Sequence, residues 1–433
     1  MASHLDFSLA LSLLFAAAVV LQWLLRVWLV SRQVRHVASH RAAVPATFAH
    51  RISLAAHQKA ADYTLAKAKV SLIDITLSAA VLLCWTLLGG LDALNSWLSG
   101  LLGPGMWQQL ALLAGFALIS GLIELPLSLY QTFRLEQRFG FNQMTLGLWL
   151  GDLLKSTLVG AVIGLPIAAL ILWLMGTTGP MWWLWAWGAW TVFNLLLMWI
   201  FPSFIAPLFN KFEPLTDEVL KTRVTALMQR CGFAAKGLFV MDGSRRSAHA
   251  NAYFTGFGNS KRVVFFDTLL KQLSADEVEA VLAHELGHFK HKHITKRMLL
   301  MFGVSLLGFA LLGWLSQQLW FYSGLGVAPL INQGFGPATG NNALALLLFM
   351  LAVPVFSFFV TPLLSAMSRR DEFEADAYAM QQADGAQLAS ALLKLYEDNA
   401  STLTPDPWYV SFYYSHPPAV DRLARMPAPA GSL

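Results

Sequence analysis

The chain has 433 residues, of which 56% are hydrophobic and only 13% are charged, and its formal net charge is +5. Ordinary globular domains contain about 25% charged residues, so this composition excludes a soluble globular protein. The small positive excess does not indicate nucleic-acid binding, because the Lys and Arg residues are concentrated in alternate loops between apolar stretches.

Seven apolar stretches are long enough to cross a bilayer as helices, which takes about 20 residues. They are residues 7–30, 70–91, 106–130, 156–176, 181–204, 297–320 and 343–366. The loops 92–105, 177–180 and 321–342 contain no Lys or Arg, whereas the other loops are rich in both. The positive-inside rule therefore predicts that the N-terminus lies outside and the C-terminus lies in the cytoplasm.

A soluble insert separates the fifth and sixth stretches. It contains a predicted helix from Thr216 to about Cys231 and predicted strands at 238–241, 251–254 and 262–266. After the seventh stretch, 367–400 is predicted to be helical and 401–433 irregular. We therefore divide the chain into four parts: residues 1–204 (five spans with their cytoplasmic loops), 205–296 (the insert), 297–366 (two spans) and 367–433 (a C-terminal cytoplasmic segment).

The insert ends in the sequence His284-Glu285-Leu286-Gly287-His288. On a helix, residues four apart share a face, so both histidines can bind one Zn²⁺ ion. Glu285 would then lie beside the water held by the metal and could take its proton as a general base. A capping box at 274–277 and an apolar stripe support a helix here.

A catalytic zinc site needs a third protein ligand and an open position. Glu372 and Asp376 follow the seventh span and lie four residues apart, so one helical face offers two carboxylates. One could bind the metal while the other holds a ligand histidine by its second ring nitrogen. His291 and His293 are alternative ligands, but they alternate with Lys290 and Lys292, so we expect a solvated basic helix end there.

Together, these segments resemble the integral-membrane zinc proteases of the Ste24 type, the CAAX prenyl protease family. The resemblance covers nearly the whole chain. It rests on the HELGH sequence at 284–288, the Ser-Arg-x-x-Glu-Phe-x-Ala-Asp sequence at 368–376, and further segments at 130–133, 139–142, 204–212, 251–254 and 416–418.

The resemblance implies seven helices around a large intramembrane chamber, with the active site at its cytoplasmic end. It implies that His284, His288 and Glu372 bind one Zn²⁺ ion and that Glu285 is the general base. Asp376 matches a carboxylate regarded as catalytic in the family, and its spacing also suits a role in holding a ligand histidine.

The resemblance also implies substrate contacts. The strand Asn251, Ala252, Tyr253 and Phe254 would pair with the substrate backbone, and His416 would stabilise the tetrahedral oxyanion. Asp74 or Glu124, acidic residues at membrane depth, would line the chamber.

We therefore predict a mostly α-helical membrane zinc endopeptidase with a cytoplasmic α+β protease domain. Its partners would be the bilayer and a peptide substrate, prenylated (CAAX-like) or otherwise membrane-anchored. We expect no nucleic acid and a monomeric chain. Short loops and a strong charge bias suggest a bacterial inner membrane.

Three alternatives stay open. A heat-shock-type membrane protease carries the same metal motif but usually has about four spans. A site-2-type intramembrane protease would place HExxH inside an apolar span, whereas charged residues flank this one. A seven-span metal-binding transporter or receptor would use the acidic residues at membrane depth for permeation.

Overall fold

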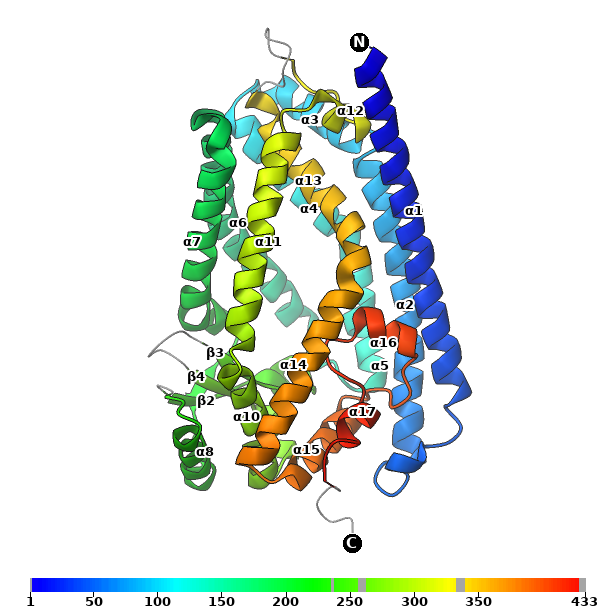
Figure 1. Ribbon diagram of the computed structural model, residues 1–433, viewed down its shortest axis with the longest axis vertical. Helices are drawn as coiled ribbons and strands as arrows, with labels where there is room; N and C mark the ends of the chain where they lie inside the picture. The colour runs from blue at the N-terminus through cyan, green and yellow to red at the C-terminus, as the bar shows by residue number, and fades with distance from the viewer. Residues whose placement is uncertain (1, 235–236, 256–261, 332–338, 428–433) are drawn as a thin grey trace.

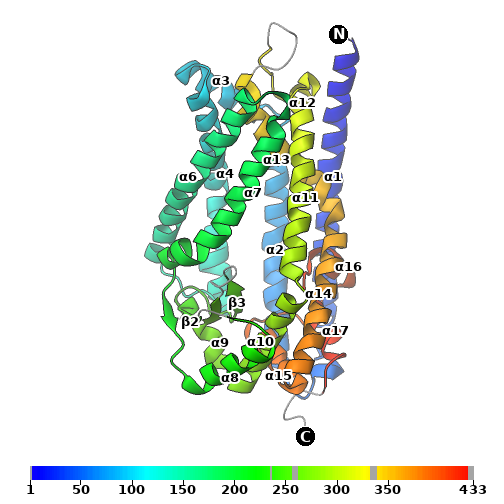
Figure 2. The same ribbon diagram turned by 60° about the vertical axis from the view of Figure 1, so that its left-hand side comes forward.

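The computed structural model describes residues 2–234, 237–255, 262–331 and 339–427. Long helices run side by side along its long axis, and a small sheet lies at the same end as α15 (Gly385–Asp398) and α17 (Ala419–Leu423) (Figures 1 and 2). Seven helical segments in the described part are long and apolar enough to span a membrane. The seven predicted spans are thus confirmed, in α1 (Ala2–Ser39), α2 (Leu54–Trp85), α4 (Met106–Tyr130), α6 (Leu146–Thr177), α7 (Trp182–Ile200), α11 (His293–Leu315) and α13 (Asn342–Ser357).

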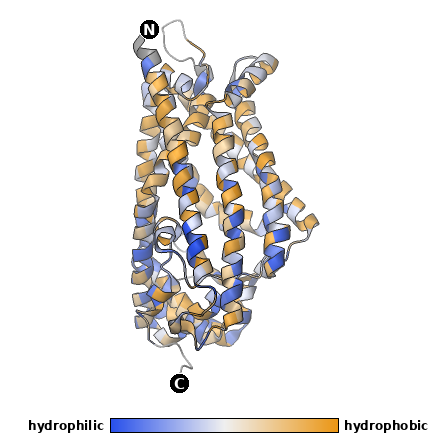
Figure 3. Ribbon diagram, turned by 90° about the vertical axis from the view of Figure 1, so that its right-hand side faces the viewer, coloured by the Kyte–Doolittle hydropathy of each residue, from blue (hydrophilic) through white to orange (hydrophobic). Residues whose placement is uncertain are grey.

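The outer surface of these helices is strongly apolar. Large side chains such as Leu13, Val162 and Leu307 are more than half exposed. Such exposure is unfavourable in water but not against lipid tails. Hydrophilic residues gather at the end that holds the sheet (Figure 3). The surface therefore matches a protein embedded in a bilayer along most of its length.

The span boundaries differ from prediction at one end of the molecule. The second span ends at Trp85, and α3 (Gly90–Leu102) occupies most of the stretch predicted as a loop at 92–105. Gly89, with a φ of 79°, turns the chain between the two helices. Leu91 and Leu98 pack α3 onto the spans, which explains a helix in a segment without Lys or Arg. A further short helix, α12 (Leu319–Gly324), follows the sixth span.

The insert forms a four-stranded sheet in the order β1-β2-β4-β3. The three predicted strands correspond to β2 (Gly237–Met241), β3 (Ala252–Thr255) and β4 (Arg262–Phe266), and β1 (Phe212–Pro214) is additional. β2 and β4 are parallel, and β3 pairs antiparallel with β4 alone among the described strands, so β3 is an edge strand there. The predicted helix is α8 (Glu218–Arg230), capped by the Asp217 side chain.

Four helices pack against the sheet and against one another around the His284–His288 motif. These are α9 (Asp267–Gln272), α10 (Ala275–Lys290), α14 (Thr361–Gln382) and α15 (Gly385–Asp398). α14 crosses the predicted division at 366/367 without a break, and the division into four parts stays a prediction. The C-terminal segment is less irregular than predicted, because Asp406 caps α16 (Pro407–Tyr413) and Pro418 precedes α17 (Ala419–Leu423).

A cavity of about 1030 Å³ lies between α2, the segment Gln131–Glu136 that follows α4, residues 247–251 and the C-terminal segment. Its wall includes Asp74 as predicted, together with Tyr63, Glu136, Asn251 and His416, whereas Glu124 is not part of it. The cavity is larger than most small-molecule sites, which measure about 300–1000 Å³. Its lining includes no described residue of α4, α6, α7, α11 or α13, so a chamber enclosed by all seven spans stays a prediction.

Candidate active site

The metal motif lies on α10, whose start is fixed locally. Ser274 Oγ accepts from the backbone N–H of Glu277, and the Glu277 carboxylate accepts from the N–H of Ser274 at 2.8 Å. Glu277 also accepts hydrogen bonds from Ser390 (2.8 Å) and Lys394 (2.7 Å) of α15. The predicted capping box is thus confirmed, and it ties the start of α10 to α15.

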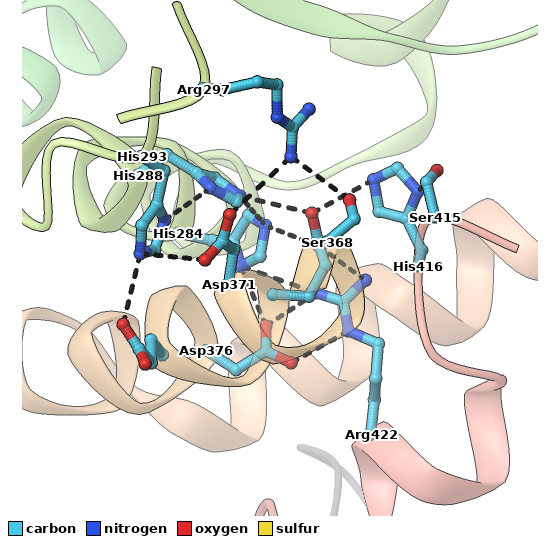
Figure 4. Close-up of polar contacts among 12 residues, drawn as sticks. His284, His288, His293, Arg297, Ser368, Asp371, Asp376, Ser415, His416 and Arg422 are labelled. Carbon is cyan, nitrogen blue, oxygen red and sulfur yellow. Dashed lines mark hydrogen bonds and ion pairs between the residues drawn. The ribbon is translucent and has the colours of Figure 1, made fainter. Parts of the chain in front are cut away.

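α14 crosses α10 at very close range because residue 287 has no side chain. A Cβ added to Gly287 would lie 2.8 Å from the Cα of Ala375, which is fully buried. Helix backbones can approach this closely only where small residues meet. This contact brings Glu372 of α14 to the same face of α10 that carries both histidines. Figure 4 shows His284 and His288 beside Asp376 of α14 at this crossing.

The three predicted metal ligands form a compact triangle. The Nε2 atoms of His284 and His288 are 3.3 Å apart. The Glu372 carboxylate oxygens are 3.3 Å from His284 Nε2 and 3.4 Å from His288 Nε2. Two ligands bound tetrahedrally to Zn²⁺ at about 2.0–2.1 Å are separated by about 3.3–3.4 Å. The spacing of the donor atoms therefore fits a tetrahedral divalent ion of this size.

The burial of Glu372 also fits a role in binding a cation. Its side chain is only 6% exposed, and its Oε2 atom is buried with no well-formed hydrogen bond within the described residues. A buried carboxylate oxygen without a partner is unfavourable unless a cation binds it. The site thus has donors of the right type, spacing and charge for a divalent metal.

Asp376 is placed behind His284 and does not belong to the ligand triangle. Its Oδ1 atom is 2.8 Å from His284 Nδ1, so the carboxylate fixes the tautomer that presents Nε2 to the metal position. Burial lowers the pKa of His284, but the hydrogen bonds to Asp376 and Glu372 outweigh it and raise the pKa to about 9. Asp376 and Glu372 therefore both stabilise a positive charge at His284.

Arg422 completes this arrangement. It donates from Nε to Asp376 Oδ2 at 2.8 Å and from Nη2 to Oδ1 at 2.6 Å. Both side chains are less than one-tenth exposed. The two parallel bonds hold the carboxylate in one plane, and this in turn orients His284.

Replacing Arg422 with Leu should destabilise the protein by about 3–5 kcal/mol, because the Asp376 carboxylate would stay buried without its partner. Arg425→Leu, which changes an exposed arginine three residues away, is the matched control. Thermal unfolding of purified protein compares the two variants. Equal stability of R422L and R425L would contradict the structural role of the pair.

His288 is held from the opposite side by His293. Their Nδ1 atoms are 3.0 Å apart, and His293 Nε2 lies 3.2 Å from Glu374 Oε2. The prediction of a solvated basic helix end is therefore wrong for His293, which is only 2% exposed. Lys292 adopts a left-handed conformation with a φ of 56°, so the chain turns and α11 begins with His293 facing His288.

Glu285 faces a pocket of about 130 Å³ that also contains His284, Asn251, Ala252 and His416. Burial raises the pKa of the Glu285 carboxyl above its usual range, although both nearby histidines lower it. A raised pKa brings this carboxylate nearer to neutral pH, where a general base is most effective. Its position and its acidity both suit proton transfer.

His416 enters the site from the loop between α16 and α17. Its Nε2 atom lies 3.3 Å from Glu372 Oε1, and its Nδ1 atom is 3.0 Å from Ser415 Oγ. The His416 side chain forms part of the cavity wall and is 62% exposed. The protein around the ring shields it in part from solvent, and this desolvation lowers its pKa. A neutral ring that accepts from Ser415 carries its proton on Nε2, the atom that faces the metal position.

The predicted substrate strand reaches the site only in part. Asn251 and Ala252 line the pocket next to His284 and Glu285. Tyr253 lies in a separate small pocket on the other face of the sheet, and Phe254 packs edge-on against Phe233. These two side chains are therefore not in the pocket, and only the backbone of β3 could contact a substrate along its full length.

Comparisons with known proteins agree with this geometry. Residues 33–211 match the family model for the CAAX prenyl protease N-terminal region with five membrane helices, and residues 214–430 match peptidase family M48. The crystal structure of S. mikatae Ste24p aligns with a TM-score of 0.88 at 33% identity, covering 96% of this chain and 98% of that chain. The CAAX prenyl protease 1 homolog of Homo sapiens is 30% identical over 456 residues, covering 95% of this chain and 94% of its own length. That of Oryza sativa subsp. japonica is 38% identical over 320 residues, covering 74% and 73%.

The chain belongs to the CAAX prenyl protease family within the M48 peptidases. It is therefore a multi-pass membrane metalloprotease, and the predicted family, fold and enzyme class are confirmed. The transporter or receptor alternative is wrong. The match of residues 33–211 to the CAAX prenyl protease N-terminal model favours this family over the heat-shock-type alternative.

Two residues near the centre of this M48 peptidase were missed by the sequence analysis. Arg422 is a single arginine without a motif, and its contacts with Asp376 form only after folding. His293 was considered only as a rival ligand, and its contact with His288 depends on the turn at Lys292. A regular helix through 288–293 would not bring these rings together, so no signal in the sequence marked the contact.

Proposed function

We propose that this chain is a zinc endopeptidase that cleaves near the C-terminus of prenylated, CAAX-like peptides at the membrane surface. The observation that supports zinc most directly is the triangle of His284, His288 and Glu372, with donor separations of 3.3–3.4 Å. The names of the relatives support the substrate class. The cavity beside the site supplies space for a substrate.

Zinc, when bound there, would polarise the scissile carbonyl and make a water molecule more acidic. Glu285 would take the proton from the attacking water and deliver it to the leaving amine. His416 Nε2 would donate a hydrogen bond to the developing oxyanion. Asp376 and Arg422 would keep His284 in the orientation that this chemistry needs.

The substrate backbone would add to the free edge of β3. Within the described residues, β3 pairs only with β4, so one side of its backbone is open. A peptide in extended conformation can form main-chain hydrogen bonds with such an edge. Ala252, the first residue of β3, and Asn251 directly before it border the pocket of Glu285, so a bound peptide would pass the general base.

A farnesylated C-terminal peptide and its unprenylated twin test the substrate class. We expect the farnesylated peptide to be cleaved with a higher kcat/KM, because an anchored tail raises its concentration at the membrane and can occupy the chamber. Mass spectrometry of the products over a concentration series gives both the rate and the cleaved bond. Equal kcat/KM for the two peptides would contradict the preference for a lipidated substrate.

We also propose that the site faces the cytoplasm and that the N-terminus lies outside. Three loops without Lys or Arg support this orientation. In a chain whose native Cys84 and Cys231 are replaced by Ser, Thr177→Cys and Ser323→Cys should react with an impermeant maleimide from outside. Glu218→Cys should react only after the membrane is opened. The reverse pattern would show the opposite orientation.

A single chain carries the complete site, since the metal ligands, Glu285, His416 and Arg422 all belong to it. A monomer is therefore sufficient for the proposed reaction. The bacterial inner membrane stays a prediction from the short loops and their charge bias.

A further inference from the structure

A second group of metal-binding side chains lies beyond His288, on the side away from the ligand triangle. His293 Nε2 is 3.2 Å from Glu374 Oε2, and His291 Nδ1 is 4.0 Å from the same oxygen. One donor atom from each of the three residues lies within 4.8 Å of the others. Asp371 Oδ1 is 3.6 Å from His293 Nε2 and offers a fourth donor.

This cluster depends on the turn that joins α10 to α11. The left-handed conformation of Lys292 stacks the rings of His291 and His293 at a centroid distance of 5.5 Å and an interplanar angle of 15°. Glu374 and Asp371 arrive from α14. His293 is buried, whereas His291 and Glu374 are partly exposed, so an ion could enter from solvent without disturbing the core.

We propose that His291, His293 and Glu374, with Asp371, bind a second divalent transition-metal ion that inhibits the enzyme. Two imidazoles and two carboxylates are donors that Zn²⁺ accepts readily. Arg370 holds the other oxygen of Glu374, Oε1, at 3.1 Å, and Arg297 lies 3.7 Å from Asp371. Arg370 and Arg297 leave Glu374 Oε2 available to bind a metal, but their positive charges repel a cation at this site. The second site is therefore weaker than the first.

The inhibition follows from the proton positions on two rings. When His288 binds a metal through Nε2, its proton is on Nδ1 and is donated to His293 Nδ1, 3.0 Å away. His293 must then carry its own proton on Nε2, facing Glu374.

A metal bound to His293 Nε2 requires that proton to leave, and a neutral ring then carries its proton on Nδ1. Two N–H groups would face each other across 3.0 Å, so the hydrogen bond that holds His288 is lost. When a metal occupies the second site, His293 therefore no longer orients the His288 ring, and the geometry of the active site is no longer fixed.

The number of zinc ions per chain tests the site directly, whether or not the proposed substrate is correct. Full-length protein without a polyhistidine tag, in detergent, is dialysed against a series of free Zn²⁺ concentrations, and bound zinc is measured. We expect two ions per chain, the second binding at least about tenfold more weakly. His291→Ala should bind only one, and the exposed control His50→Ala should bind two.

Peptide cleavage tests the inhibition, and this part rests on the proposed function. His291→Ala leaves His288, His293 and Glu374 in place, so its activity at one zinc per chain should equal that of the wild type. We expect excess zinc to inhibit the wild type and His50→Ala, and the inhibitory concentration to rise at least about tenfold in His291→Ala.

One zinc per wild-type chain at saturation, or two in His291→Ala, would overturn the second site. Equal inhibition of wild type and His291→Ala would overturn its inhibitory role. An absence of cleavage by every variant, with metal binding intact, would instead contradict the proposed peptide substrate.

Discussion

Replacing Glu285 with Gln is expected to lower kcat for a cleavable peptide by about 10²–10⁴-fold, with little change in KM. Gln has the same shape, so it still fits the pocket beside His284. It cannot accept a proton from water, however, so binding survives while the chemical step fails. The loss should therefore fall on kcat.

The comparison needs zinc content, thermal unfolding and steady-state kinetics for each protein. Glu397→Gln on α15 is a matched control, since it makes the same change at an exposed position. E285Q should keep one zinc at the catalytic site and unfold at the wild-type temperature. Activity within tenfold of the wild type would exclude Glu285 as the general base.

The second large effect is expected for Glu372→Gln, which should remove both metal and activity. The change replaces a charged ligand by a neutral amide, leaving His284 and His288 alone to hold the ion. Two protein ligands are fewer than the three found in catalytic zinc sites. Metal analysis after dialysis at low free zinc measures the loss.

The Asp376→Asn variant distinguishes the role of Asp376 from that of Glu372. This variant still offers a hydrogen-bond acceptor to His284, so it should lower zinc affinity by only about 10–100-fold. Glu397→Gln should behave as the wild type. Zinc loss in Asp376→Asn with retention in Glu372→Gln would reverse the roles proposed for the two carboxylates.

The sequence predicted those parts of the site that depend on local periodicity. The capping box and the spacing of His284 and His288 follow from helix geometry alone, and the structure contains both in α10. The seven spans follow from length and apolarity. Such features need no knowledge of distant contacts, since each is specified within a single stretch of chain.

Contacts between segments far apart in the sequence were harder to predict. Residue spacing left Glu372 and Asp376 as alternative ligands, and the structure separates them through the crossing at Gly287 and the pairing of Asp376 with Arg422. α3 was missed because a short segment without Lys or Arg has the composition of an external loop. In each of these cases tertiary packing, which spacing does not encode, decided the outcome.

The position of β3 at the edge of its sheet has a consequence for which proteins can be cut. An edge strand pairs only with a chain in extended conformation, so under the proposed binding to β3 a C-terminal tail that is helical or packed would first have to unfold. The free energy of that local unfolding adds to the activation barrier. Two tails with the same residues around the scissile bond would thus be processed at different rates according to their flexibility. Ordered tails would be spared, and the enzyme would select its targets by disorder as well as by chemistry.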